Sequence, residues 1–257
     1  MNTSNSDRSD YRDLCRLAAT SDQDFKRFRH HPVYTGIVET VPPADGAAYI
    51  TVALRNDPSI ANHLEELRRN DAVGAPMVCQ YGPIGGFAPT TLRYIQTAVD
   101  LKRLFGPLDG MRVVEIGGGY GGLCRILHAQ NRIESYTIVD LPEALDLAKR
   151  YLGEFSVPNV SFAPPNQDIF PDFDLLISNY AYSELDKATQ DLYLDRILSR
   201  CRRGYMMYNQ VSFAESMPGF HHTVESVAAR IPQSRILSGE PALAPPDAVR
   251  RHSLLIW

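Results

Sequence analysis

The sequence lacks several features that would point to whole classes of protein. It has only four cysteines, Cys15, Cys79, Cys124 and Cys201, which are far apart and form no CxxC pair. A disulfide framework or a zinc site needs closer spacing, so we expect free thiols in a reducing compartment. No apolar run approaches the roughly 20 residues of a membrane span. The N-terminus, MNTSNSDRSD, has no apolar segment after its charges, unlike a secretory signal. These absences predict a cytoplasmic protein that binds no membrane.

An excess of positive charge is also missing. Lys and Arg together number 26 and Asp and Glu number 30, which gives a formal net charge of −4. Domains that bind nucleic acids usually carry a basic excess, so no nucleic acid is expected as a partner. The chain has 257 residues, of which 44% are hydrophobic and 22% are charged. These fractions are those of an ordinary globular protein, and the length suits one full domain with an extension.

The first 105 residues are expected to be mostly helical. Apolar residues recur at helical spacing in the segments 11–29, 59–70 and 90–105. The intervening residues 32–58 contain four prolines and few periodic runs, and a loop rich in Gly and Pro follows residue 70. We expect residues 1–105 to form a helical extension that caps the carboxyl edge of a sheet. The residues of this cap expected near bound ligands are Gly85, Gly86, Thr90, Thr91 and Arg93.

From Met111 onward, short apolar runs alternate with helical patterns. The expected strands are 111–116, 135–139, 160–163, 173–178, 205–209, 234–237 and 253–257. The expected helices are 120–130, 142–152, 186–201 and 219–230. About nine residues separate the third and fourth strands, which is too short for a crossover helix. Strands that alternate with helices predict an α/β fold with a mainly parallel sheet.

A glycine-rich turn after the first of these strands is the strongest indication of a ligand site. The segment VVEIGGGYGG, residues 113–122, runs from a hydrophobic strand into the turn and then into a helix. Gly117 and Gly119 can adopt positive φ and leave bare backbone against a ligand. The start of the helix adds N–H groups that have no partner within the helix. The segment also fits G-x-G-x-x-G, a pattern that dinucleotide-binding enzymes share.

Three acidic residues follow or end successive strands and narrow the choice of ligand. Glu115 lies two residues before the first glycine, where a carboxylate disfavours a pyrophosphate and suits a cationic or amine-bearing cofactor. Asp140 follows the second strand, where an acid can accept both hydroxyls of a ribose. Asp168 follows the third strand and can accept from an adenine amino group. Turn glycines and solvated acids are the alternative interpretation.

The segments EIGGGYGG, YTIVDLPEA and SNYAYSEL together resemble the sugar O-methyltransferase family of class I S-adenosylmethionine-dependent methyltransferases. The pattern E-x-G-x-G-x-G resembles motif I of that superfamily. The tyrosine within the glycine turn, the D-L-P after the second strand and the upstream segments NDAVGAP and FAPTTLRYIQ resemble this family more specifically. The resemblance covers roughly residues 60–257.

This resemblance implies a Rossmann-like class I methyltransferase sheet in residues 106–257, mainly parallel with an antiparallel last strand. It implies S-adenosyl-L-methionine as the cofactor and transfer of a methyl group to a hydroxyl of a sugar or sugar-like small molecule, in natural-product or polysaccharide biosynthesis. The residues that carry the family's cofactor role are Glu115, Gly117, Gly119 and Asp140. The further cofactor-binding candidates are Gly118, Tyr120, Leu141, Asp168 and Asn179.

The loop after the fourth strand, SNYAYSEL, faces the transferable methyl group in this superfamily. Methyl transfer needs the acceptor oxygen in line and about 3–3.5 Å from the reacting carbon, and a general base to take the proton of the hydroxyl. The candidates for this base are Glu184 and His222, followed by Tyr182 and His221. A helix-terminal charge and a surface histidine pair are the alternatives. The candidates for binding the acceptor are Arg93, Tyr180 and Asn209. The rings of Tyr120, Tyr180 and Tyr182 can stabilise a sulfonium.

Other functions remain open at this stage. No pair of Asp residues follows the fourth strand, so no metal site is expected. The alternatives are a nicotinamide dehydrogenase, a small-molecule N-methyltransferase and a catalytically idle binding protein of methyltransferase fold. The N-P-P-Y type of loop that suits planar amines is absent. The sequence leaves open which hydroxyl of which acceptor is methylated, and whether the chain is a monomer or a homodimer.

Overall fold

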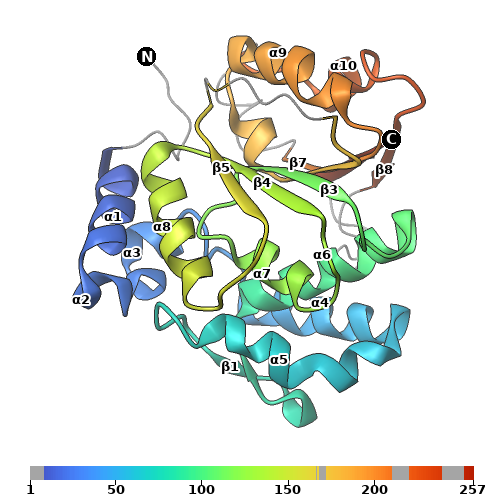
Figure 1. Ribbon diagram of the computed structural model, residues 1–257. Coiled ribbons are helices and arrows are strands. Elements are labelled where there is room, and N and C mark those ends of the chain that lie inside the picture. The colour runs from blue at the N-terminus through green and yellow to red at the C-terminus, as the bar shows by residue number, and fades with distance from the viewer. Residues whose placement is uncertain (1–8, 166, 168–171, 210–219, 239–251) are drawn as a thin grey trace.

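The computed structural model describes residues 9–165, 167, 172–209, 220–238 and 252–257. Its main element is a seven-stranded sheet with the strand order β5-β4-β3-β6-β7-β9-β8 (Figure 1). Its strands are β3 (Arg112–Ile116), β4 (Ser135–Val139), β5 (Val160–Ala163), β6 (Leu175–Asn179), β7 (Gly204–Asn209), β8 (Arg235–Ser238) and β9 (His252–Ile256). The last strand, β9, is antiparallel to β7 and β8, and the other pairs are parallel. The predicted α/β fold, mainly parallel with an antiparallel last strand, is confirmed.

The order of the strands fixes where a ligand can bind. The chain builds outward from β3 through β4 to β5 and then returns to the other side of β3 with β6. Between β3 and β6 the direction of winding reverses, so the connections after these strands leave toward opposite faces. Open α/β sheets bind ligands in the crevice that forms beyond the carboxyl ends at such a switch point.

Helices cover both faces of the sheet. On one face lie α6 (Pro89–Phe105), α7 (Gly122–His128) and α8 (Pro142–Gly153), and on the other lie α9 (Lys187–Arg196) and α10 (Val224–Ala228) (Figure 1). Two 3-10 turns accompany them, η6 (Ala181–Glu184) and η7 (Leu198–Arg200). The predicted helix 186–201 is therefore divided between α9 and η7. The predicted helix 219–230 is shorter than expected, because residues 220–223 are not helical, Thr223 caps α10, and residue 219 lies outside the described residues.

The N-terminal part is helical but more divided than its sequence suggested. Its helices are α1 (Ser9–Thr20), α2 (Asp22–Phe25), α3 (Pro32–Thr35), α4 (Pro43–Asn56) and α5 (Leu64–Arg68). Its 3-10 turns are η2 (Phe28–His30), η3 (Pro58–His63), η4 (Arg69–Asp71) and η5 (Gly82–Ile84). A two-stranded hairpin of β1 (Cys79–Gln80) and β2 (Gly86–Phe87) lies in the loop rich in Gly and Pro. The single helix predicted over 59–70 is instead η3, α5 and η4 in succession.

The sequence did not predict helix α4, because its residues show little helical periodicity. It begins at Pro43, where the missing N–H costs nothing, and it contains an interior glycine, Gly46, which weakens helices. It buries Tyr49, Ile50 and Ala53 and packs against α6. Tertiary packing therefore stabilises a helix that the local pattern does not predict.

The N-terminal helices share a core with the sheet. One cluster of buried side chains includes Tyr11 and Phe28 from the N-terminal part as well as Leu123 of α7 and Leu147 of α8. Helix α1 packs on α8, and α6 packs on α7 (Figure 1). Among the described helices, none has both the length and the apolar character that a membrane span requires.

Candidate functional site

A cavity of about 430 Å³ opens at the carboxyl ends of the central strands. The sheet contributes the ends of β3, β4, β6 and β7, the turns that follow β3, β4 and β6, and His252 of β9. The N-terminal part closes the opposite side with Tyr11, residues 36–38 and 40–42, Asp45 and Tyr49. The cavity therefore lies at the switch point, between the sheet and the N-terminal part.

Two glycines shape the turn after β3. Gly117 has φ 76°, and a Cβ at this position would lie 2.0 Å from the Cβ of Ala181. Gly119 has φ 54°, and the nearest atom to a Cβ there would be Cγ1 of Val38 at 3.8 Å. Gly117 is thus required by close packing between the turns after β3 and β6. Gly119 leaves an open stretch of backbone in the wall of the cavity.

Asp140 holds this turn from the end of β4. Its Oδ2 accepts from the N–H of Gly119 at 2.9 Å, and its Oδ1 accepts from the N–H of Leu141 at 2.7 Å. A carboxylate has about four lone-pair sites, so acceptor capacity remains for hydroxyls of a ligand. Burial raises the pKa of Asp140 to about 6, which leaves it mostly ionised at neutral pH.

Glu115 is a buried carboxylate on the floor of the cavity. Glu115 is only 3% exposed, and its Oε2 accepts a hydrogen bond from the hydroxyl of Tyr136 at 2.8 Å. Burial, with a smaller contribution from the charge of Asp140, raises the pKa of Glu115 to about 7. In the described part of the chain, no Lys or Arg forms an ion pair with Glu115. A buried carboxylate without a counter-charge favours a ligand that brings a cation.

The turn after β6 is strained. Tyr180 has φ 70° and ψ −31°, a conformation that costs a non-glycine residue about 1–3 kcal/mol. The hydroxyl of Ser183 donates to the carbonyl of Tyr180 at 2.6 Å and accepts from the N–H of Asn209 at 3.1 Å. The Tyr180 ring lies 5.6 Å from the guanidinium of Arg93 and 5.0 Å from the ring of His252. Such strain concentrates at binding and catalytic sites.

Glu184 is a predicted base that lies in the cavity wall. It ends the 3-10 turn η6 and lines the cavity. Burial raises the pKa of Glu184 to about 7. A base is most effective when its pKa lies near the working pH, so this carboxylate can take a proton from a bound hydroxyl at neutral pH.

The structure places the other three predicted bases away from the cavity wall, as far as the chain is described. Tyr182 is 1% exposed and donates its hydroxyl to the carbonyl of Gln190 at 3.0 Å, within the core under α9. The ring of His222 is bonded to Oδ1 of Asp191 at 3.0 Å, on the side of α9. His221 packs against the ring of Phe220 at 5.5 Å. None of these three side chains lines the cavity that Glu184 lines.

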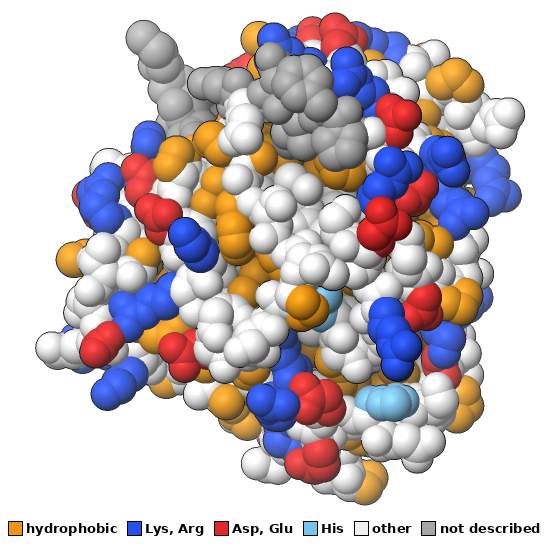
Figure 2. Space-filling model, viewed as in Figure 1, with side chains coloured by type: hydrophobic (Ala, Val, Ile, Leu, Met, Phe, Trp, Pro, Cys, Tyr) orange, Lys and Arg blue, Asp and Glu red, His pale blue; other side chains and the backbone are white. Residues whose placement is uncertain are grey.

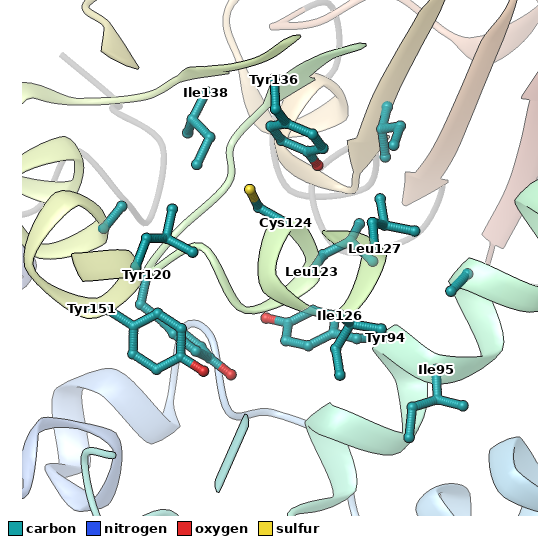
Figure 3. Close-up of a cluster of buried hydrophobic side chains, with 14 of the residues drawn as sticks. Tyr94, Ile95, Tyr120, Leu123, Cys124, Ile126, Leu127, Tyr136, Ile138 and Tyr151 are labelled. Carbon is teal, nitrogen blue, oxygen red and sulfur yellow. The ribbon is translucent and has the colours of Figure 1, made fainter. Parts of the chain in front are cut away.

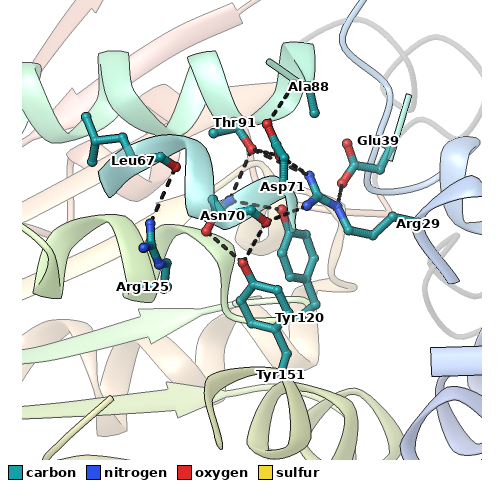
Figure 4. Close-up of polar contacts among 10 residues, drawn as sticks. All are labelled: Arg29, Glu39, Leu67, Asn70, Asp71, Ala88, Thr91, Tyr120, Arg125 and Tyr151. Carbon is teal, nitrogen blue, oxygen red and sulfur yellow. Dashed lines mark hydrogen bonds and ion pairs between the residues drawn. The ribbon is translucent and has the colours of Figure 1, made fainter. Parts of the chain in front are cut away.

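The side chain of Tyr120, a predicted cofactor contact, also lies away from the cavity. Its side chain is completely buried, with its ring 4.7 Å from that of Tyr151 (Figure 3) and 4.7 Å from the guanidinium of Arg29. Arg29 is itself buried and pairs with Glu39 at 2.5 Å and Asp71 at 3.1 Å (Figure 4). Tyr120 therefore anchors the glycine turn to the N-terminal part, and its ring does not face the cavity.

The remaining predicted residues divide into three groups. Those that line the cavity are Glu115, Gly117, Gly118, Gly119, Asp140, Leu141, Asn179, Arg93, Tyr180 and Asn209. Four predicted residues do not line the cavity: Gly85, Gly86, Thr90 and Thr91. The two glycines of the hairpin lie next to Arg68, and the hydroxyl of Thr91 donates a hydrogen bond to Asp71. Asp168 lies outside the described residues.

Sequence reasoning missed the wall residues Tyr11, Asp45, Tyr49 and His252. Nothing in their local sequence marks them, because the chain brings them to the cavity from segments far from the glycine turn. The described residues include no group of three or more His, Cys, Asp and Glu side chains that could hold a metal ion. On the face shown in Figure 2, acidic and basic side chains are interspersed.

Comparison with known proteins gives a likeness in structure and none in sequence. No family model matches the chain, and no curated protein matches it. The methyltransferase domain of bacterial CtHen1 is similar, with 17% identity, a TM-score of 0.49, and coverage of 64% of this chain and 96% of that one. The N-methyltransferase NodS from Bradyrhizobium japonicum has 14% identity, a TM-score of 0.48, and coverage of 64% and 92%.

A SAM-dependent methyltransferase from Aquifex aeolicus has 14% identity, a TM-score of 0.43, and coverage of 62% of this chain and 87% of that one. At such identities the likeness concerns the fold alone. The strand order and the antiparallel β9 describe a Rossmann-like α/β fold.

Proposed function

We propose that the protein is an S-adenosylmethionine-dependent methyltransferase that acts on a hydroxyl of a sugar or sugar-like small molecule. The observation that carries this proposal is the arrangement of Glu115, Gly117, Gly119 and Asp140 around one cavity at the switch point of the sheet. It agrees with the motif E-x-G-x-G-x-G, which resembles motif I of the class I enzymes.

The residues present fit this cofactor. Glu115 is a buried carboxylate that lacks a cationic partner among the described residues, and an amino group of the cofactor would supply one. Asp140 would accept hydrogen bonds from the ribose hydroxyls with the acceptor capacity that its two backbone contacts leave. The bare backbone at Gly119 would allow close approach. The bound cofactor supplies an electrophilic methyl group on a sulfonium.

Glu184 would act as the general base. Methyl transfer would join the acceptor oxygen to the methyl group, with the sulfur of the cofactor leaving as a neutral thioether. The Glu184 carboxylate would take the proton of the acceptor hydroxyl. Arg93, Tyr180 and Asn209 line the same cavity and would orient the acceptor. A general base of this kind contributes typically about 10²–10⁴-fold to the rate.

The preference for an oxygen acceptor rests on the loop after β6. Its sequence, SNYAYSEL, resembles the sugar O-methyltransferase family and lacks the N-P-P-Y type of loop. An N-methyltransferase and an idle binding protein of the same fold are the alternatives. We further propose that the acceptor is a small molecule and that neither a nucleic acid nor a membrane is a partner. We also propose that the protein is cytoplasmic. Measurement of its mass in solution tests whether it forms a homodimer.

Two experiments test this function. Thermal unfolding in the presence of adenosylhomocysteine or NAD separates a methyltransferase from a nicotinamide dehydrogenase, and we expect only adenosylhomocysteine to raise the Tm. Incubation with methyl-labelled S-adenosylmethionine and a panel of sugars, sugar acids, sugar phosphates and amines then identifies the acceptor class. Label found only in amines would support the N-methyltransferase, and binding of cofactor without transfer to any member of the panel would support an idle binding protein.

A further inference from the structure

A second cavity, of about 290 Å³, lies beside the first between α4, α6 and the strands β6, β7 and β9. We call it the side chamber. Four residues line both cavities: Tyr49, Arg93, Asn179 and Tyr180. The strained turn at Tyr180 and the side chain of Arg93 therefore stand at the border between the two spaces. A ligand that reaches past this border would touch both.

The two cavities differ in charge. The first contains four carboxylates, those of Asp45, Glu115, Asp140 and Glu184, with Arg93 at its border. The side chamber is lined by three arginines, Arg55, Arg93 and Arg103, and by a single carboxylate residue, Asp100, whose Oδ1 lies 3.7 Å from Nη1 of Arg103. A cationic ligand is therefore favoured in the first cavity and an anionic group in the side chamber.

The side chamber also contains a buried hydrogen-bond acceptor to which no described group donates. Gln96 on α6 is only 6% exposed, and its Oε1 is buried with no hydrogen-bond partner among the described residues. Buried polar atoms are normally satisfied by protein, water or ligand. Asn56 and Thr97 add further polar groups to the same wall. A hydroxyl-bearing ligand would satisfy Gln96 while its anionic group pairs with the arginines.

We propose that the side chamber binds the part of the methyl acceptor that carries an anionic group, and that the acceptor is a polyhydroxylated anion such as a sugar acid or a sugar phosphate. The anionic group pairs with Arg93 together with Arg55 and Arg103, and a hydroxyl donates to Gln96. The rest of the acceptor extends past Tyr180 into the first cavity, where Glu184 lies. This inference rests on the proposed function, since it names the substrate class of the same site.

The test compares three probes by calorimetric titration of the full-length protein at constant ionic strength, with and without saturating adenosylhomocysteine. The probes are D-glucose, D-glucuronate and D-glucose 6-phosphate. We expect both anionic probes, or one of them, to bind at least tenfold more tightly than glucose. The carboxylate and phosphate arms show which anion the side chamber prefers.

Variants locate the binding. Arg93→Gln, and the double variant Arg55→Gln with Arg103→Gln at two exposed positions, should each reduce the preference for the anionic probe at least threefold. Gln96→Leu should lower the affinity for the anionic probe, while the protein still binds this probe more tightly than glucose. Lys102→Gln is the matched control, because Lys102 lies on the same helix but pairs with Asp57 outside the chamber; its affinities should equal those of the wild type.

Equal affinity for glucose and both anions would overturn the inference, as would a preference that survives all the arginine variants. These failures are distinguishable from failure of the proposed function. If adenosylhomocysteine binds while the anions show no preference, only the acceptor class is wrong. If the anions bind at the arginines but adenosylhomocysteine does not bind, the side chamber is an anion site and the methyltransferase proposal fails.

Discussion

Replacement of Glu184 by glutamine should make the protein more stable and less active. The amide has almost the same shape as the carboxyl group but carries no charge at any pH. Burial raises the pKa of Glu184 to about 7 in the folded protein, whereas a glutamate in an unfolded chain has a pKa of about 4.3. The folded state therefore binds the proton more tightly than the unfolded state.

The sign and size of the stability effect follow from this difference. Between about pH 4.3 and pH 7 the folded state holds more protons on Glu184, so its contribution to the free energy of unfolding falls as the pH rises. One pKa unit corresponds to about 1.4 kcal/mol, which sets an upper limit of about 3–4 kcal/mol above pH 7. Because the residue is partly exposed to solvent, screening reduces this value, and we expect about 1 kcal/mol.

The assay is urea unfolding of wild type and Glu184→Gln at pH 5 and pH 8, together with single-turnover methyl transfer to the acceptor that the labelling screen identifies. The variant should gain stability over the wild type as the pH rises from 5 to 8. Its rate should fall by about 10²–10⁴-fold and lose its dependence on a group that titrates near pH 7, with cofactor affinity nearly unchanged. Glu134→Gln, at an exposed turn, is the control. A stability difference that is the same at both pH values would refute the burial argument, and a wild-type rate and pH profile would refute the role as base.

Four further predictions follow from the same geometry. Gly119→Val should abolish adenosylhomocysteine binding in calorimetry, because its side chain enters the cavity and its φ of 54° strains valine. Affinity for S-adenosylmethionine should fall about tenfold per pH unit well below pH 7, since protonation of Glu115, with its pKa of about 7, removes the charge that pairs with the amino group; an affinity that is constant from pH 8 to pH 5.5 would contradict this. Tyr182→Phe should lower the free energy of unfolding by about 1 kcal/mol through loss of a buried hydrogen bond, with cofactor affinity unchanged in titration. His222→Asn should keep the wild-type rate in single-turnover assays, and a rate reduced tenfold or more would restore it as a candidate base.

The sheet could be predicted from the sequence because each strand is a short apolar run that the fold buries. The run around Val113 and Val114, for example, is buried on both faces of the sheet, as a parallel strand requires. The glycine turn could also be predicted from the sequence. Only glycine tolerates the positive φ at Gly117 and the close approach of Ala181. Glu115 and Asp140 could be assigned because strand ends in a parallel sheet meet at one edge.

Side-chain direction in the turn after β6 could not be predicted. Tyr182 and Glu184 lie two residues apart in one 3-10 turn, yet one side chain enters the core and the other lines the cavity. The turn begins at Tyr180 with a positive φ, and no residue type in the segment signals this backbone conformation. The same holds for His252 and Gln96, whose roles depend on helices and strands that meet only in the folded chain.

The central claim, that the cavity binds S-adenosylmethionine through Asp140, is tested most directly by calorimetric titration of adenosylhomocysteine into the wild type, Asp140→Ala and the control Asp146→Ala. Asp146 lies on the exposed side of α8 and takes no part in the cavity. Two charge-assisted hydrogen bonds are worth on the order of 1.5–3 kcal/mol each, and the variant also loses the contact with the Gly119 N–H. The account predicts binding by the wild type and by Asp146→Ala, and at least tenfold weaker binding by Asp140→Ala with an unchanged circular dichroism spectrum. No binding by the wild type, or equal affinity in all three proteins, would contradict it.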